Sequence, residues 1–386
     1  MEQKPTARVQ AIDVIRGAIM VLMAIDHVRV YAGVPAGGPQ PAVFFTRWVT
    51  HFCAPGFVFF AGAAAYLQKD KWPNRAGLSR WLLVRGAWLL LLELTWMRLC
   101  WTFNLDFANY LLAGVLWAIG WSLIALAGLI WLPLPAVGAL GLAVIGLHDA
   151  GAGQVRAHSA ALAAGSLGWL WKALYLGGSI GPLVILYTLI PWVGVIAAGW
   201  AFGPILRLSP ERRRTWCFAI GGAAIAAFLL LRGLDLYGDP RPWSSQPPRM
   251  APLLRFLNTT KYPASLLYLL MTLGPLISAL PLVERARGPV SRTLAVFGRV
   301  PLFYYVLHIP LIHALALFIS LVRTGKVSPW LFENHPMGMS QAPAGSVWSL
   351  PVLYLIAAAA VAMLYLPCRW YAELKARKQS TWLSLL

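Results

Sequence analysis

An apolar segment near the start of the chain, residues 11–31, carries ionisable side chains of both signs. It contains Asp13, Arg16, Asp26 and His27, although a charge at bilayer depth is costly unless it is paired or hydrated. Arg16 and His27 are eleven positions apart, about three helical turns, so they share one face of a helix and lie about 16 Å apart along its axis. This pattern indicates a polar functional site inside a membrane. The alternative is a charged stripe that only fixes this helix against its neighbours.

The composition is that of a polytopic membrane protein. Of 386 residues, 59% are hydrophobic and only 12% are charged, whereas about a quarter of the residues in a soluble domain are charged. The net charge of +19 would suit a nucleic-acid-binding protein, but the basic residues stand in short runs between apolar segments, as topology signals do. Nucleic-acid binding is therefore excluded.

Ten apolar stretches are near the roughly 17–25 residues that cross a bilayer, although the fifth is short. They cover residues 11–31, 44–67, 80–102, 110–132, 134–148, 183–206, 216–232, 264–283, 300–322 and 347–368. We expect an all-α transmembrane helix bundle of about ten spans, with residues 1–386 forming one domain. Residues 1–10 are polar and no cleavage site follows them, so the first span is expected to remain in the mature protein.

Basic residues gather in connections that fall on one side of this ten-span arrangement. These connections are residues 68–79, 207–215, 284–292 and 369–386, and Lys4 and Arg8 at the N-terminus join them. The positive-inside rule makes that side cytoplasmic, with both termini inside. The basic connection 233–263 faces the other way, which indicates either an error in the topology or an outer binding surface. The binding surface is the preferred interpretation.

Two outer connections are long. Residues 149–182 could form an interfacial amphipathic helix, and the proline-rich residues 233–263 predict an ordered, irregular loop, with Pro263 opening the eighth helix. The second connection offers carboxylate, amide, ammonium and aromatic groups, namely Asp239, Trp243, Asn258, Lys261 and Tyr262. Such groups suit a sugar, whose hydroxyls hydrogen-bond to polar side chains while its apolar face stacks on rings. A well-folded loop without a ligand is the alternative.

Other polar residues stand at the ends or in the middle of predicted spans. Arg299 precedes Pro301, and a helix N-terminus beside a guanidinium is an anion site that could hold a phosphate; a topology-setting arginine is the alternative. One of His308 and His313 is expected to face a polar cavity and the other to pack. His51 stands four residues before a proline, so it could orient a ligand or satisfy a freed carbonyl.

Glu93 lies within a run of leucines in the third span and needs a partner, for which an arginine of another span is preferred. No metal site is expected, because no two histidines stand three or four positions apart and no HExxH motif is present. The cysteines lack metal-ligand or CxxC spacing and are expected to pack as small apolar side chains. They are Cys53, Cys100, Cys217 and Cys368.

A series of longer motifs runs in order along nearly the whole chain. They read IDVIRGAIMVLMAIDHVRVY, THFCAPGFVFFAG, RGAWLLLLELTW, LWAIGWS, PWVGVIAAGWAFG, YGDPRPW, FLNTTKYPASLLYLLMTLGP and FGRVPLFYYVLHIPLIH. The series resembles the bacterial branch of the heparan-α-glucosaminide N-acetyltransferase family, and the spacing of Arg16 and His27 is similar to the Arg-x10-His signature of the membrane acyltransferase-3 family. Both resemblances imply transfer of an acetyl group from cytosolic acetyl-CoA to a sugar or glycan across the membrane. The first implies a multi-pass protein of the bacterial inner (plasma) membrane.

Two departures from the lysosomal enzyme of that family affect the site. Its proposed catalytic histidine lies in the loop after the first core span, whereas residues 32–41 here contain no histidine. It also has an asparagine where His27 stands, so heparan sulfate specificity is not carried over. The catalytic assignment of His27 therefore rests on the acyltransferase-3 pattern and on its place in the span.

The resemblances imply roles for the residues of the first span. His27 would be the general base on the acceptor hydroxyl or amine. Asp26 is a second catalytic candidate, although it lies about 100° around the helix from His27 and would need a backbone or water link to orient that ring. Arg16, steadied by Asp13, would hold the acyl donor.

Donor binding is also expected of Arg299, His51 and His308. The expected partners are a coenzyme A thioester, a sugar or glycan acceptor and membrane lipid, and a homo-oligomer stays open. Direct transfer and a route through an acetyl-histidine are both open. The competing function is a transporter or exporter of a lipid-linked glycan that uses the same cavity without chemistry, and a non-catalytic scaffold is the third.

Overall fold

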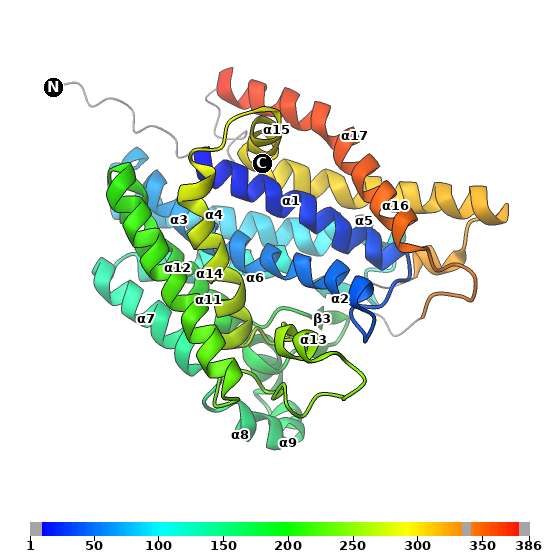
Figure 1. The fold of residues 1–386 in the computed structure, drawn as a ribbon, viewed down its shortest axis with the longest axis horizontal. Helices are drawn as coiled ribbons and strands as arrows, with labels where there is room; N and C mark the ends of the chain where they lie inside the picture. The colour runs from blue at the N-terminus through cyan, green and yellow to red at the C-terminus, as the bar shows by residue number, and fades with distance from the viewer. Residues whose placement is uncertain (1–9, 334–340, 378–386) are drawn as a thin grey trace.

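The protein's structure, a computed structural model, describes residues 10–333 and 341–377. Nearly all of its regular structure is helical, and the helices form a bundle (Figure 1). The first helix, α1 (Gln10–Tyr31), packs mainly against five others: α3 (Cys53–Gln68), α14 (Leu266–Val283), α15 (Pro289–Arg299), α16 (Pro301–Thr324) and α17 (Leu350–Arg377). The charged first segment of the chain therefore lies inside the bundle.

The other elements complete the bundle and its connections. The longer helices are α4 (Arg75–Leu92), α6 (Val115–Leu129), α7 (Leu134–Leu147), α11 (Leu189–Phe202) and α12 (Pro210–Gly233). The shorter helices are α2 (Pro41–Trp48), α5 (Arg98–Thr102), α8 (Ala152–Ala157), α9 (Ser159–Ala164), α10 (Gly168–Trp171) and α13 (Pro252–Leu257). The 3₁₀ and π turns are η1 (Val49–Phe52), η2 (Lys69–Lys71), η3 (Glu93–Met97), η4 (Lys172–Leu176), η5 (Gly203–Arg207) and η6 (Pro329–Phe332).

Each of the ten predicted spans coincides with a helix or a helical run. Six runs of the described chain are long and apolar enough to cross a membrane: Pro41–Lys71, Leu189–Arg207, Pro210–Gly233, Leu266–Val283, Pro301–Thr324 and Leu350–Arg377. Helices α6 and α7 are apolar but shorter, and α1 is long enough but carries more charges. The predicted all-α membrane bundle is confirmed, and the count of ten spans stays a prediction.

A small sheet was not expected. Strand β3 (Leu183–Ile185) pairs in parallel with β1 (Leu111–Ala113) and antiparallel with β2 (Gly178–Ile180). Two predicted spans began at residues 110 and 183, but β1 and β3 lie at those ends of the spans and the helices begin only at Val115 and Leu189. A short apolar run does not distinguish a buried strand from a helix by its periodicity, which explains the difference.

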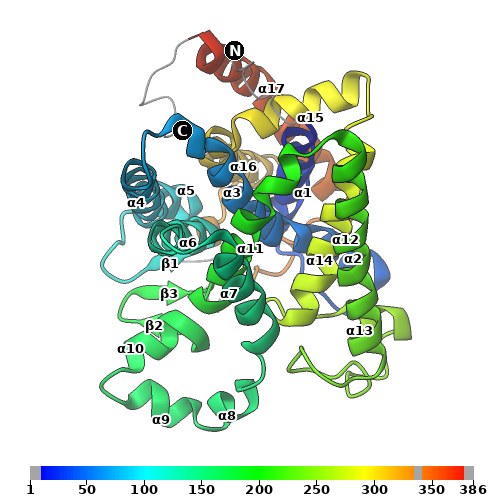
Figure 2. The same ribbon diagram turned by 90° about the vertical axis from the view of Figure 1, so that its left-hand side faces the viewer.

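The two long outer connections differ in kind. Residues 149–182 form three short helices, the π turn η4 and strand β2 rather than one amphipathic helix, and Gly165 ends α9. Figure 2 shows the short helices with the small sheet at one end of the bundle. Residues 233–263 form the predicted irregular loop, interrupted by α13. Pro263 does not open the next helix: Ser265 caps α14 by accepting a hydrogen bond from the Tyr268 N–H at 3.2 Å.

Helix α15 was predicted only as a basic connection. It lies so close to α1 that a Cβ added at Gly17 would meet the backbone of Leu294, and one added at Gly298 would meet the carbonyl of Asp13. The sequence signal for this helix is weak because its two arginines resemble those of a topology loop, although Pro289 stands at its first turn. The tight seam places Arg299, the last residue of α15, beside the inner end of α1.

Candidate active site

Two histidines from distant parts of the chain meet inside the bundle. His27 of α1 and His308 of α16 are 281 positions apart, and the His27 Nδ1 lies 2.6 Å from the His308 Nε2. The His308 Nδ1 lies 2.6 Å from the backbone oxygen of Tyr305. His308 is fully buried, whereas His27 is partly exposed. Hydrogen bonds therefore link a buried carbonyl of α16, through His308, to the partly exposed His27.

The packing of α1 against α16 brings the two rings together. His308 stands seven residues after Pro301, about 10 Å along α16, and so lies well inside the bundle. The edge of Trp101 packs on the His27 ring, with the ring centres 5.0 Å apart and the planes at 81°. The other candidate of α16, His313, packs between aromatic rings, 4.0 Å from that of Phe103. His313 is thus the packing member of the pair, as one of the two was predicted to be.

Asp26 does not contact the His27 ring. Its carboxylate oxygens lie 3.1 Å from the Arg29 Nε and 3.2 Å from the Arg47 Nη1. Arg47 is itself buried and donates to the Thr50 hydroxyl at 2.9 Å. The carboxylate is therefore occupied by two guanidinium groups, and it joins α1 to α2 rather than orienting the histidine.

Two of the five predicted acceptor residues lie near this centre. Lys261 is buried, with its ammonium 5.2 Å from the Tyr262 ring, and it lies within electrostatic range of Asp26 and His27. No hydrogen bond or ion pair joins Lys261 to another residue of the described chain. Desolvation alone would raise the pKa of the Tyr262 hydroxyl, but the charges of Lys261 and Arg47 outweigh it and the pKa falls below its usual value. The surroundings of His27 on this side are thus positive.

The other three predicted acceptor residues hold the loop together. The Asp239 carboxylate accepts hydrogen bonds from the Thr260 N–H and from the hydroxyls of Thr260 and Ser265. The Asn258 amide pairs with that of Gln246 at 2.9 Å. The Trp243 ring packs on Phe256, with the ring centres 5.7 Å apart. These contacts match the alternative of a well-folded loop at those three positions.

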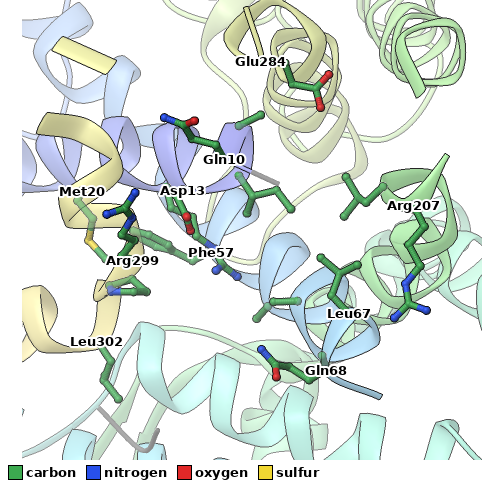
Figure 3. A pocket seen from close by; sticks show the side chains of 18 of the residues that line it. Gln10, Asp13, Met20, Phe57, Leu67, Gln68, Arg207, Glu284, Arg299 and Leu302 are labelled. Atoms are coloured by element: carbon green, nitrogen blue, oxygen red, sulfur yellow. The ribbon is translucent and has the colours of Figure 1, made fainter. Parts of the chain in front are cut away.

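A cavity of about 1820 Å³ opens at the end of the bundle that carries the basic connections (Figure 3). Its wall includes Gln10 and Ala376, so both ends of the described chain reach the same face. Among the described residues, ten basic side chains and three acidic ones line it. The basic ones are Arg16, Lys71, Arg85, Arg207, Arg213, Arg214, Arg285, Arg287, Arg299 and Lys375. This excess of positive charge suits a ligand with several anionic groups.

Three predicted donor residues line this cavity. Arg16 and Asp13 come from α1 and Arg299 from the end of α15, next to the first turn of α16; Figure 3 shows Asp13 and Arg299 close together on one side. The Arg16 guanidinium donates to the backbone oxygen of Phe60 at 2.6 Å. The predicted start of a helix at Pro301 is confirmed. Part of the wall is apolar, formed by residues such as Met20, Phe57, Leu89, Leu116, Ile119 and Leu302.

The remaining two predicted donor residues lie elsewhere. His51 does not line the cavity, and its Nδ1 lies 3.0 Å from the backbone oxygen of Trp48 and 3.2 Å from that of Arg47. His308 contacts His27 instead of the cavity. Tyr305 connects the two places, because it lines the cavity and its carbonyl accepts a hydrogen bond from His308.

Some residues of the site were not predicted from the sequence. Arg47, Tyr305 and the pairing of His308 with His27 depend on which spans are neighbours, and no local motif marks them. The partner of Glu93 was predicted wrongly: its carboxylate accepts from the Gly114 N–H at 2.9 Å, at the start of α6, so a helix N-terminus takes the place of the expected arginine. Arg232, at the end of a predicted span, is buried and donates to four backbone oxygens of the 233–263 loop.

Comparison with known proteins identifies the family. A search of curated proteins found no significant match. The family model described as heparan-alpha-glucosaminide N-acetyltransferase, catalytic, matches residues 8–236, more than half of the chain. The matched region contains α1 with His27, the two arginines that bind Asp26, and most of the cavity wall. The chain is an integral membrane protein and belongs to the heparan-alpha-glucosaminide N-acetyltransferase family, whose activity is acetyl transfer.

Proposed function

We propose that the protein transfers an acetyl group from acetyl-CoA, bound in the basic cavity, to a hydroxyl or amino group of a sugar or glycan that lies beside His27. The observation that carries this proposal is the position of His27. It is partly exposed and is tied through His308 to Tyr305, which lines the cavity. Tyr305 thus lies between the basic cavity and the histidine pair, of which His27 can accept a proton.

The cavity fits the donor substrate by charge and by lining. Coenzyme A carries phosphates at one end and an uncharged arm at the other. The guanidinium and ammonium groups of the wall match the phosphates, and its apolar part matches the arm. Arg299 makes no hydrogen bond or ion pair within the described chain, so its guanidinium is available to a phosphate.

The chemistry needs one base and one positioned thioester. A ring nitrogen of His27 takes the proton of the acceptor O–H or N–H while that oxygen or nitrogen attacks the thioester carbonyl. The C–S bond then breaks, the acetyl group stays on the acceptor, and the thiolate takes the proton back as free coenzyme A. General base catalysis of this kind typically contributes about 10²–10⁴-fold in rate.

The two substrates reach the site from opposite faces. The cavity opens among the basic connections, which the positive-inside rule makes cytoplasmic. Lys261 and Tyr262, from the opposite connection, border the acceptor position near His27 and match an acceptor on the outer side. In a bacterium, this membrane is the inner membrane.

The test is acceptor-dependent release of thiol. Purified protein is incubated with acetyl-CoA, with and without glucosamine or a membrane glycolipid extract, and free thiol and acetylated product are both quantified. We expect equal amounts of the two, formed only with an acceptor. Glycan movement in vesicles without thiol release would instead identify a transporter and overturn the proposal.

A further inference from the structure

The hydrogen bonds of the histidine pair have a direction that the heavy-atom positions determine. The His308 Nδ1 lies 2.6 Å from the Tyr305 carbonyl oxygen, and a carbonyl can only accept. The Nδ1 of His308 therefore carries a hydrogen. His308 is fully buried, with no carboxylate in contact within the described chain. Because burying an unpaired charge is costly, its ring is neutral and its Nε2 is bare.

The tautomer of His27 follows from that of His308. A bare Nε2 on His308 can only accept, so the hydrogen in the 2.6 Å contact belongs to the Nδ1 of His27. A neutral His27 ring then has its lone pair on Nε2, the nitrogen that points away from His308. This is the tautomer that a general base facing the acceptor requires.

We propose that His308 is a positioning residue for the transfer reaction: it receives the Nδ1 hydrogen of His27, fixes that ring in the tautomer with a free Nε2, and stabilises it when Nε2 takes the acceptor proton. The proposal deepens the proposed function and rests on it. His27 takes the acceptor proton and returns it to the coenzyme A thiolate, and His308 forms no covalent bond.

A neutral partner for His27 is less costly to bury in a membrane than a charged carboxylate. In many hydrolases a carboxylate orients the catalytic imidazole, and Asp26 is the nearest carboxylate in sequence. It is held by Arg29 and Arg47 and does not reach the ring. A histidine backed by a carbonyl provides an acceptor for the His27 hydrogen without another buried charge. Tyr304, whose ring stacks on His308 with the centres 5.4 Å apart, keeps the orienting ring in place.

Two substitutions at position 308 separate positioning from packing. In His308→Gln the amide oxygen can stand where Nε2 stood and accept the His27 hydrogen, while His308→Asn keeps a polar group only near the Nδ1 position. We expect kcat to fall at least about 100-fold in His308→Asn and less than about tenfold in His308→Gln. The KM for acetyl-CoA should be unchanged in both. Similar kcat losses in the two variants, with equal thermal stability, would overturn the proposal.

A second measurement does not depend on activity. Nitrogen-15 NMR of histidine-labelled protein reports which ring nitrogen carries the hydrogen, and the His27 signals are identified as those absent from His27→Ala. We expect hydrogen on Nδ1 of His27 in the wild type, and a mixture of tautomers in His308→Asn. Hydrogen on Nε2 in the wild type would refute the positioning role even if acetyl transfer is observed. Hydrogen on Nδ1 together with no acetyl transfer would refute only the proposed function.

Discussion

Replacing Arg299 by alanine should weaken the binding of acetyl-CoA about tenfold. Arg299 is exposed at the cavity wall and makes no hydrogen bond or ion pair with other described residues. A charge-assisted hydrogen bond contributes about 1.5–3 kcal/mol, which corresponds to a roughly 10- to 150-fold change in Kd. Because solvent screens an exposed charge, the loss should lie near the lower end of that range.

The assay is calorimetric titration of acetyl-CoA into each purified variant, with a thermal melt to check folding. Arg292→Ala is the matched control, because Arg292 is an exposed arginine of the same helix that does not line the cavity. Arg299→Lys should be intermediate, since an ammonium keeps the charge but loses the planar fork. The affinity of the wild type should also fall as salt is added.

Two results would refute a contact between Arg299 and the phosphates of acetyl-CoA. An unchanged Kd in Arg299→Ala would place the phosphates elsewhere and leave Arg299 as a topology signal. Equal losses in Arg299→Ala and Arg292→Ala would show a general effect of surface charge rather than a contact in the cavity.

Further variants test the outer side of the site and the topology. Lys261→Met should raise the KM for the acceptor at least several-fold and leave the acetyl-CoA Kd unchanged in calorimetry. A change in the acetyl-CoA Kd alone would instead assign Lys261 to the donor site. Arg232→Ala should lower stability by about 1–3 kcal/mol, because it leaves buried carbonyls without donors, and an unchanged melting temperature would contradict this. A cysteine at Ser245 should react with an impermeant thiol reagent in intact cells and one at Lys71 should not; the native cysteines are buried and give little background. The reverse pattern would invert the topology.

Hydropathy and charge were enough to predict the bundle, because each span is a local property of about 20 residues. The helix start at Pro301 was also predictable, since proline at the first helical position is a local signal. Helix α15 was missed because its arginines resemble a topology loop, and its tight seam with α1 depends on Gly17 and Gly298 meeting backbone from another segment. That contact has no local signature.

In the candidate site, too, residues with a local sequence signal were predicted and residues that depend on long-range contacts were missed. His27, Arg16 and Arg299 were found from residue type and spacing, and the structure places the two arginines on one cavity. The partner of His27 was not found, because His308 is 281 positions away and only the packing of α16 on α1 brings it near. Asp239 and its neighbours in the outer loop resembled a sugar site because loops use the same polar groups to satisfy their own backbone.

The most direct test of the account uses sealed proteoliposomes in which the protein has a known orientation. Acetyl-CoA is supplied only on the side of the basic cavity and glucosamine or a glycolipid acceptor only on the other, and acetylated acceptor is measured by mass spectrometry for the wild type and for His27→Ala. We expect product on the acceptor side with the wild type, at least about 100-fold less with His27→Ala, and the same acetyl-CoA Kd for both proteins. Activity of His27→Ala within threefold of the wild type, or product only when both substrates are on one side, would contradict it.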